Sequence, residues 1–295
     1  MDTGRHRGGD PGQQWIATST KALVSREESP VVPSIETHTE GAGRKLLLVH
    51  GLGGSWKSWS PVLPFVAAQR EVIMIDLPGH GASPVRADSG TFAGLADSLE
   101  AYIRENNLES ADVAGFSLGG RLVLEMARRG CAGNIVALDP GGFWQGWERT
   151  YFRWTLGASV RLLRLLKGQL GALSRSPVTR TALLAQLSAR PWALSGEMVE
   201  RELRSFAETP TVPALIKDLA RGPAQQGPGS PASGNVTIAW GRKDRLCPPR
   251  QAARAQAAFP DAAFHWFEES GHYSIWDCPQ EAAELVLRST GSEQR

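Results

Sequence analysis

Ser117 lies at the centre of the motif Gly115-Phe116-Ser117-Leu118-Gly119. A serine hydroxyl becomes a nucleophile when the backbone presents it and a neighbouring base takes its proton. An apolar run leads into Gly115 and a helical pattern starts after Ser117, which predicts a sharp strand-to-helix turn. Gly115 and Gly119 would remove side chains that clash in such a strained turn. The alternative role for Ser117 is a helix N-cap beside a tight turn.

The helix after the motif supplies a second chemical feature. The run Leu118–Arg129 has a helical pattern and stops at Gly130, a common C-terminal signal. The backbone amide of Leu118 would then lie unpaired at a helix N-terminus, where it can stabilise an oxyanion. The motif alone is weak, because glycine-rich chains match it by chance.

His272 is the candidate general base. It follows Gly271 on a loop, after the apolar run Phe264–Phe267 and before a terminal helix at Gln280–Leu287. A general base must reach to about 3 Å from the hydroxyl, while a carboxylate holds its other ring nitrogen. The competitor is His265, whose place inside the strand-like run favours a packed or edge position.

Four blocks in one order give the chain a family resemblance. From about residue 45 to residue 287 the sequence resembles the α/β-hydrolase fold superfamily, in particular its lidded serine esterase, C–C hydrolase and haloperoxidase-like branch. The blocks are His50-Gly51-Leu52-Gly53-Gly54-Ser55, Asp76-Leu77-Pro78-Gly79-His80-Gly81-Ala82-Ser83, the serine motif, and Gly241-Arg242-Lys243-Asp244 followed by Gly271-His272.

The resemblance assigns further roles. It implies that the amide of Leu52 is the second oxyanion donor, paired with that of Leu118. It places the triad acid at Asp244, in the order Ser117, Asp244, His272 that this fold uses. Asp139 is the alternative acid, because some members of the family place the acid after the preceding strand.

Two other histidines in these blocks are expected to be structural. His50 stands at a strand end before a glycine turn, and His80 lies between two glycines in a tight turn. A serine at the motif argues against the epoxide hydrolase and haloalkane dehalogenase relatives, which carry an aspartate there. No metal or organic cofactor is implied.

The elements that must position these residues alternate along the chain. Short apolar runs at 45–50, 71–76, 112–115, 134–139 and 235–240 read as strands buried on both faces. Helical patterns between them, including Phe92–Asn106, predict a mostly parallel central sheet flanked by helices. The segments 15–24 and 31–39 are predicted to form an early pair of strands.

The alternation stops at Gly141-Gly142, which predicts a domain organisation with an insertion. We expect a disordered tail at 1–14, a core from 15–141 and 234–290, a helical lid at 142–221, and a linker loop at 222–233. The lid candidates for lining a substrate pocket are Trp144, Trp147 and Tyr151. The lid has twelve Lys/Arg against six Asp/Glu, explained by solvated helix faces or by attraction of an anionic substrate or lipid surface.

Bulk composition fits one large α/β domain with room for a smaller inserted one. The chain has 295 residues, 41% of them apolar, and a net charge of +2, which does not point to nucleic acid. Its three cysteines are too few and too scattered for a disulfide framework or a metal knuckle. No signal peptide or membrane span is evident, so the sequence predicts a cytoplasmic protein.

The sequence therefore predicts a serine hydrolase that cleaves an ester or related carbonyl bond of a small apolar molecule. Three alternatives stay open: a C–C bond hydrolase with the same triad, a tailoring enzyme of secondary metabolism, and a non-catalytic ligand-binding protein. Fold alone does not decide among them.

Overall fold

The computed structural model describes residues 35–228 and 234–291, all within one unit that spans residues 33–295. The predicted tail at 1–14 and the strand at 15–24 lie outside the described residues, as does the part of the predicted linker beyond residue 228. In the part that is described, no helix is long and apolar enough to cross a membrane.

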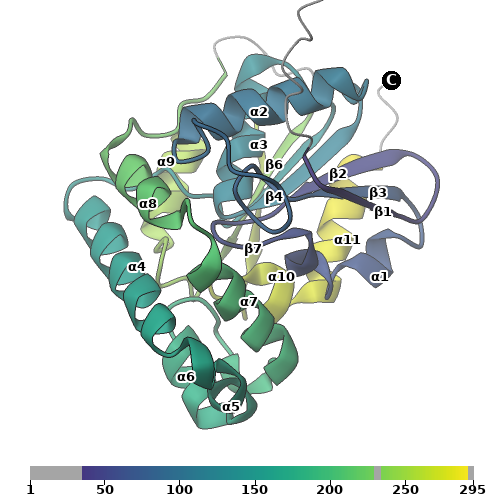
Figure 1. Ribbon diagram of the computed structural model, residues 1–295. Helices are drawn as coiled ribbons and strands as arrows, with labels where there is room; N and C mark the ends of the chain where they lie inside the picture. Colours follow the sequence, from purple (N-terminus) through teal and green to yellow (C-terminus); the bar gives the residue numbers. More distant parts are fainter. Residues whose placement is uncertain (1–34, 229–233, 292–295) are drawn as a thin grey trace, which may run out of the picture. The chain divides into compact units, whose positions relative to one another are not determined.

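A sheet with seven strands forms the centre of the fold (Figure 1). The strands are β1 (Thr37–Glu40), β2 (Lys45–Val49), β3 (Glu71–Ile75), β4 (Asp112–Phe116), β5 (Ile135–Leu138), β6 (Val236–Gly241) and β7 (Ala263–Phe267). Their order across the sheet is β1-β3-β2-β4-β5-β6-β7. β1 is antiparallel to β3, and all the other neighbours are parallel. The prediction of a mostly parallel α/β sheet is confirmed.

The helices flank and extend this sheet. They are α1 (Leu63–Val66), α2 (Phe92–Glu105), α3 (Leu118–Arg129), α4 (Trp147–Leu165), α5 (Leu170–Arg175), α6 (Pro177–Leu184), α7 (Gly196–Glu208), α8 (Val212–Arg221), α9 (Arg250–Ala258), α10 (Ser274–Asp277) and α11 (Pro279–Thr290). Short 3₁₀ turns are η1 (Trp56–Trp59), η2 (Lys167–Gln169) and η3 (Pro191–Ala193).

Successive side chains of a strand point to opposite faces of the sheet, so the apolar core is divided between the two faces. In β2, Leu47 and Val49 pack in one apolar cluster with α2 and α3, whereas Leu46 and Leu48 pack in a second with α1 and α11. Figure 1 shows α2 and α3 on one side of the sheet and α1 and α11 on the other. Because both faces are covered, the central strands read as continuous apolar runs rather than as alternating ones.

The chain between β5 and β6 is helical. Helices α4 to α8 occupy this stretch, where α4 packs against α7 and α8, and α5 packs against α6 and α7. In Figure 1 they lie together at the left and lower left of the view. This helical insertion (residues 142–221) bonds to the loop that follows β6, because Tyr151 donates to the carbonyl of Arg245 and the Arg245 side chain donates to the carbonyl of Ala185. In open α/β sheets, ligands bind at the carboxyl ends of the parallel strands.

The bounds of single helices and strands are predicted most accurately where a glycine or a long apolar run marks them in the sequence. The predicted helix Leu118–Arg129 is confirmed to the residue, because Gly130 adopts the left-handed conformation (φ 67°) that ends it. The strand predicted over 31–39 is wrong in its bounds, since β1 spans Thr37–Glu40 and residues 35 and 36 are not in a strand.

Candidate active site

The turn between β4 and α3 holds Ser117 in a strained conformation. Its φ of 55° and ψ of −115° fall in a region that L-residues rarely adopt. The turn is possible because the flanking residues Gly115 and Gly119 have no side chains. A Cβ on Gly115 would lie 2.4 Å from the carbonyl oxygen of Gly119, and a Cβ on Gly119 would lie 2.2 Å from the carbonyl oxygen of Val49. The sequence motif thus forms a tight elbow that carries Ser117 at its tip.

The structure brings Ser117, His272 and Asp244 together from three distant parts of the chain. His272 Nε2 lies 2.8 Å from Ser117 Oγ, and His272 Nδ1 lies 2.8 Å from Asp244 Oδ2. The other oxygen of Asp244 accepts hydrogen bonds from the amides of Leu246 (2.8 Å) and Cys247 (2.7 Å). These amides fix the carboxylate, which in turn orients the imidazole toward the hydroxyl.

Two opposing effects set the pKa of His272. The side chain is buried, and burial alone would lower its pKa, because it disfavours the charged imidazolium. The charge and hydrogen bond of Asp244, together with the charge of Asp139, outweigh burial and raise the pKa above its ordinary value. The site can therefore stabilise a proton on His272 once that residue has accepted one.

Asp139, the alternative acid, occupies a neighbouring position but has other partners. Its carboxylate accepts hydrogen bonds from the amides of Gly241 (2.7 Å) and Ser274 (3.3 Å). Burial, reinforced by the charge of Asp244, raises the pKa of Asp139 to about 7. Asp139 therefore acts on His272 through space, whereas Asp244 bonds to it directly.

The two expected oxyanion donors lie beside Ser117. Leu52 and Leu118 line the same pocket as Ser117 and His272. Leu118 is the first residue of α3, so its amide has no acceptor within the helix. Gly51 lets the loop that carries Leu52 approach closely, since a Cβ there would lie 2.8 Å from the Phe116 ring and 3.3 Å from Ser117 Cβ.

The remaining candidate histidines have partners outside this cluster. His50 Nε2 accepts a hydrogen bond from the Leu77 amide (3.0 Å), so its Nδ1 carries the proton that it donates to the Gly51 carbonyl (2.7 Å). His80 Nδ1 lies 3.2 Å from the Pro78 carbonyl oxygen. Burial lowers the pKa of His50 to about 4 and that of His80 to about 3. Both imidazoles therefore hydrogen-bond to the backbone of loops outside the Ser117–His272–Asp244 cluster.

His265, the competitor for the role of base, lies on β7 and pairs with Glu281 of α11 through a 2.9 Å contact. That pair is partly exposed to solvent.

A pocket opens onto Ser117 and His272 between the core and the helical insertion. The core contributes Leu52, Leu118, Arg121, Gly141, Leu246, Cys247, Tyr273 and Trp276. The insertion contributes Trp144, Phe152, Leu156, Ser159, Leu163, Leu183, Leu184, Gln186, Leu187, Glu202, Leu203, Phe206 and Leu219. Most of these side chains are apolar, which suits an apolar acyl or aryl group.

Of the three aromatic candidates in the insertion, the structure brings only Trp144 into the pocket wall. Trp144 is buried and stacks on Phe152, with ring centroids 4.5 Å apart. Trp147 is 64% exposed and lies against the guanidinium of Arg250. The hydroxyl of Tyr151 donates to the carbonyl of Arg245 and so ties α4 to the core.

The pocket also holds two charged side chains that were not among the sequence candidates, Arg121 and Glu202. Glu202 comes from α7, and its Oε2 accepts a hydrogen bond from Ser58 Oγ at 2.7 Å. Burial raises the pKa of Glu202 to about 7. Arg121 lies on α3, one helical turn beyond Ser117. The four-residue spacing from Ser117 could have identified Arg121 as a pocket residue from the sequence, because residues i and i+4 lie on the same face of a helix.

Comparison with known proteins supports the same fold. The profile of the alpha/beta hydrolase fold family matches residues 45–279. The chain is 28% identical to the dihydrolipoyllysine-residue acetyltransferase component of the acetoin cleaving system of Cupriavidus necator, over 85% of this chain and 64% of that protein. It therefore spans less than two thirds of the length of that relative.

A second relative matches over nearly the whole of both chains. The 2-hydroxy-6-oxononadienedioate/2-hydroxy-6-oxononatrienedioate hydrolase of Cupriavidus pinatubonensis is 24% identical, over 95% of this chain and 98% of that protein. Among solved structures, an esterase from Exiguobacterium antarcticum superimposes with a TM-score of 0.72 at 16% identity, covering 88% of this chain and 96% of that one. This structural likeness bears on the fold alone.

Proposed function

Because the chain belongs to the α/β-hydrolase fold family, we propose that it is a hydrolase that cleaves an ester or related carbonyl bond by way of a Ser117 acyl-enzyme. The observation that carries the proposal is the unbroken series of contacts from Ser117 Oγ to His272 and from His272 to Asp244, each 2.8 Å long. This arrangement supports nucleophilic catalysis because the base touches the hydroxyl and a fixed carboxylate touches the base.

In the first half of the proposed reaction, His272 Nε2 takes the proton of Ser117 as Oγ attacks the substrate carbonyl carbon. The amides of Leu52 and Leu118 hold the negatively charged oxygen, and Asp244 stabilises the imidazolium. The tetrahedral intermediate then collapses. The bond to the leaving alcohol breaks, and His272 gives that alcohol its proton.

In the second half, His272 takes a proton from water as the water oxygen attacks the acyl carbon. Collapse of this second intermediate releases the acid and returns the proton to Ser117. The reaction consumes one water and changes no oxidation state, so the residues of this site suffice for it.

We further propose that the helical insertion (residues 142–221) acts as a lid that selects the acyl or aryl group. Trp144, Leu156 and Phe206 face the same pocket as Ser117, and they come from well-separated parts of the insertion. A closed apolar wall excludes water other than the hydrolytic one and strengthens the electrostatic interactions inside.

A second candidate reaction, hydrolysis of a carbon–carbon bond in a diketone-like substrate, is favoured by one comparison. The Cupriavidus pinatubonensis relative, which matches nearly the full length of this chain, is named as a hydrolase of an oxo-dienedioate. Such a reaction would use the same serine, histidine and oxyanion donors, with carbon rather than oxygen as the leaving atom.

A substrate panel separates these reactions. Purified full-length protein is assayed with p-nitrophenyl esters of increasing acyl length and with a chromogenic dienoic ketone, beside the Ser117→Ala and His272→Ala variants. Ester turnover lost in both variants supports the esterase proposal, and turnover of the ketone alone supports the C–C hydrolase. If neither substrate reacts and Ser117 does not label with a fluorophosphonate probe, the proposal is wrong and ligand binding without catalysis takes its place.

A further inference from the structure

The outer face of α4, the first helix of the insertion, exposes an apolar ridge. Its large apolar side chains are each between 48% and 83% exposed: Trp147, Trp154, Leu162 and Leu165. Residues 147, 154 and 165 are separated by 7 and 11 positions, which are close to whole numbers of helical turns, so they share one face of α4. In Figure 1, α4 lies at the left edge of the ribbon. We call these four side chains the outer ridge.

The outer ridge is not the face by which α4 packs onto the rest of the molecule. Phe152, Leu156 and Leu163 of the same helix are buried and line the pocket that opens onto Ser117. A helix at the surface of a soluble protein normally carries polar side chains opposite such an apolar face. The outer ridge is therefore additional apolar surface, and a cluster of exposed large apolar side chains marks a site of interaction.

A basic groove lies beside the ridge, between α4 and α8, which pack against each other. Its cationic residues are Arg153, Arg161 and Arg164 from α4 and Lys217 from α8, and Trp154 of the ridge also lines it. The other lining residues are neutral: Gly157, Ala158, Val160, Pro213 and Ile216. In the part of the chain that the structure describes, no carboxylate lines this groove. Positive charge is thus concentrated next to the apolar ridge.

The cations of the basic groove have no acidic partners. Within residues 35–228 and 234–291, no carboxylate forms an ion pair with Arg153, Arg161 or Lys217. Arg164 donates to a neutral group, the backbone carbonyl of Ala207, at 2.9 Å. All four cationic side chains are exposed, so they are accessible to an external anion.

The acidic residues of the two helices that form the groove are bonded to other groups. Glu148, the only acid of α4, is buried and accepts hydrogen bonds from Arg250 and Arg254. Asp218 of α8 accepts a hydrogen bond from the backbone amide of Phe92 at 2.8 Å. The basic groove therefore keeps its positive charge.

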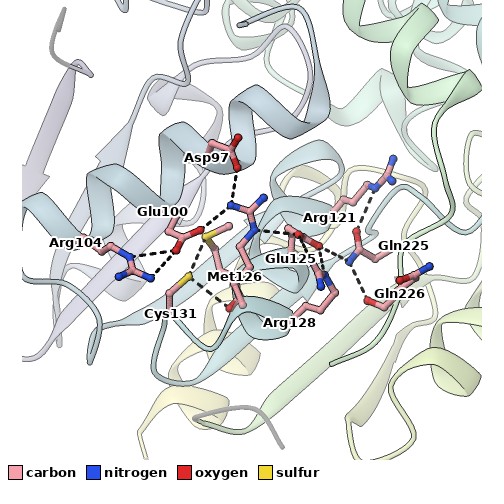
Figure 2. A network of polar contacts seen from close by, with 11 residues as sticks. Asp97, Glu100, Arg104, Arg121, Glu125, Met126, Arg128, Cys131, Gln225 and Gln226 are labelled. Carbon is pink, nitrogen blue, oxygen red and sulfur yellow. Dashed lines mark hydrogen bonds and ion pairs between the residues drawn. The ribbon is translucent and has the colours of Figure 1, made fainter. Parts of the chain in front are cut away.

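Exposed arginines on the core helices α2 and α3 show a different pattern. Figure 2 shows Arg104 bonded to Glu100 and Arg128 bonded to Glu125. These cations are balanced by carboxylates of the same helix, whereas the cations of the basic groove are not. An unbalanced cluster of exposed cations attracts an external anion.

We propose that the outer ridge and the basic groove bind α4 to the surface of an anionic membrane. The tryptophan and leucine side chains enter the boundary between headgroups and acyl chains, while the arginines beside them stay at the level of the phosphate groups. Anionic headgroups supply the counter-charges that the groove lacks. The helix lies on the bilayer surface in this arrangement and does not span it.

Two other partners fit this face less well. A second copy of the chain, packed on the same ridge, would place two basic grooves at one interface, and like charges across an interface oppose association. A nucleic acid would balance the arginines but offers no hydrocarbon phase for Leu162 and Leu165. An anionic membrane suits both the charge of the groove and the apolar character of the ridge.

Vesicle sedimentation with the purified full-length protein tests this inference. Vesicles of equal parts phosphatidylglycerol and phosphatidylcholine are compared with vesicles of phosphatidylcholine alone. We expect binding to the anionic vesicles to be at least about tenfold tighter. Most of that preference should disappear when NaCl rises from about 0.1 M to about 1 M, because salt then screens charges beyond about 3 Å.

A double variant tests the contribution of the basic groove. Arg153→Gln/Arg161→Gln should weaken binding to the anionic vesicles at least about fivefold, because it removes two charges that face the headgroups. Arg104→Gln/Arg128→Gln is the matched control, since it removes the same charge from exposed sites on α2 and α3. The control should change binding by less than about twofold.

A second double variant tests the outer ridge. Trp154→Ser/Leu165→Ser should weaken binding at least about tenfold, because it removes apolar surface that enters the bilayer. Phe65→Ser/Val85→Ser, which changes two exposed apolar residues outside the insertion, is its control. Urea unfolding checks that each variant is as stable as the unaltered protein. If the ridge variant is not, the single change Leu165→Ser, at a site that is 83% exposed, replaces it.

No binding to vesicles, equal binding to both kinds, or equal losses in the test and control variants would overturn the inference. It would also be overturned by a dimer that sedimentation velocity detects, that Trp154→Ser/Leu165→Ser dissociates and that does not bind vesicles, since the ridge would then join two copies. The inference goes beyond the proposed function and does not depend on it. None of the changed residues lines the pocket at Ser117, so failure here leaves the hydrolase proposal standing. Failure of Ser117 to react with a fluorophosphonate would likewise leave membrane binding standing.

Discussion

Asp244 and Asp139 act on the same imidazole, but Asp244 bonds to it whereas Asp139 is held by backbone amides. Asp244 Oδ2 lies 2.8 Å from His272 Nδ1, and the oxygens of Asp139 accept from the amides of Gly241 and Ser274. The two carboxylates follow neighbouring strands, β5 and β6. The difference in partners predicts different consequences when each charge is removed.

Asp244→Asn should lower kcat/KM by roughly 10³–10⁴, because an amide at this position favours the wrong histidine tautomer. Asp139→Asn should lower it by less than about tenfold, since the imidazole keeps its direct partner. Steady-state kinetics on the best ester of the panel measure both values. Equal losses, or a larger loss in the Asp139 variant, would transfer the role of acid to Asp139.

As the pH is lowered, kcat/KM should fall with a midpoint above pH ~6.5, the ordinary pKa of histidine. His272 must be neutral to act as a base, and nearby carboxylates raise its pKa, so activity is lost as the pH falls through that raised value. Asp139→Asn removes one of the charges that raise this pKa, so its midpoint should move to lower pH. A midpoint that stays in place, or that moves upward, would contradict the electrostatic account of the site.

Gly115→Ala and Gly119→Ala should each abolish most activity and destabilise the fold by about 1–3 kcal/mol, because the new Cβ would overlap backbone atoms at the elbow. Gly157→Ala is the matched control on α4, where a Cβ would meet nothing within 4 Å. It should be neutral or stabilise by up to about 1 kcal/mol. Chemical denaturation and ester kinetics on the three variants provide the comparison. Full activity in either elbow variant would show that the turn is less tightly packed than the structure indicates.

Arg70→Met should lower the free energy of unfolding by about 3–5 kcal/mol, because it leaves the buried carboxylate of Asp112 without its buried partner. Arg44 also pairs with Asp112, but its side chain is 39% exposed, so Arg44→Met should cost less than about 1 kcal/mol. Urea titrations of both variants measure the difference. A similar, small loss in both would mean that the Arg70–Asp112 pair contributes little to stability.

The sequence predicted those features whose signals are local. Glycines two positions on either side of Ser117 encode the elbow, and Gly130 encodes the end of α3, so both could be placed without a structure. The order of Ser117, Asp244 and His272 also could be read from the family resemblance, but not their contacts. Those contacts depend on the parallel register of β4, β5 and β6, which a single sequence does not specify.

The pocket was harder to predict, because it depends on which face of a helix turns inward. Trp144 and Trp147 are three residues apart and look equivalent in sequence, yet one is buried in the pocket wall and the other is 64% exposed. Arg121 was missed because a charged residue on an amphipathic helix is expected to face solvent. Here it is buried, with 2% of its surface exposed.

The nucleophilic role of Ser117 is the central claim, and covalent labelling tests it most directly. The full-length protein is treated with a fluorophosphonate probe, and intact mass and peptide mapping locate the adduct. We predict one adduct per chain, on Ser117, with labelling abolished in Ser117→Ala and strongly slowed in His272→Ala, because the probe requires an activated serine. An unlabelled wild-type protein, or an adduct that persists in Ser117→Ala, would contradict the account.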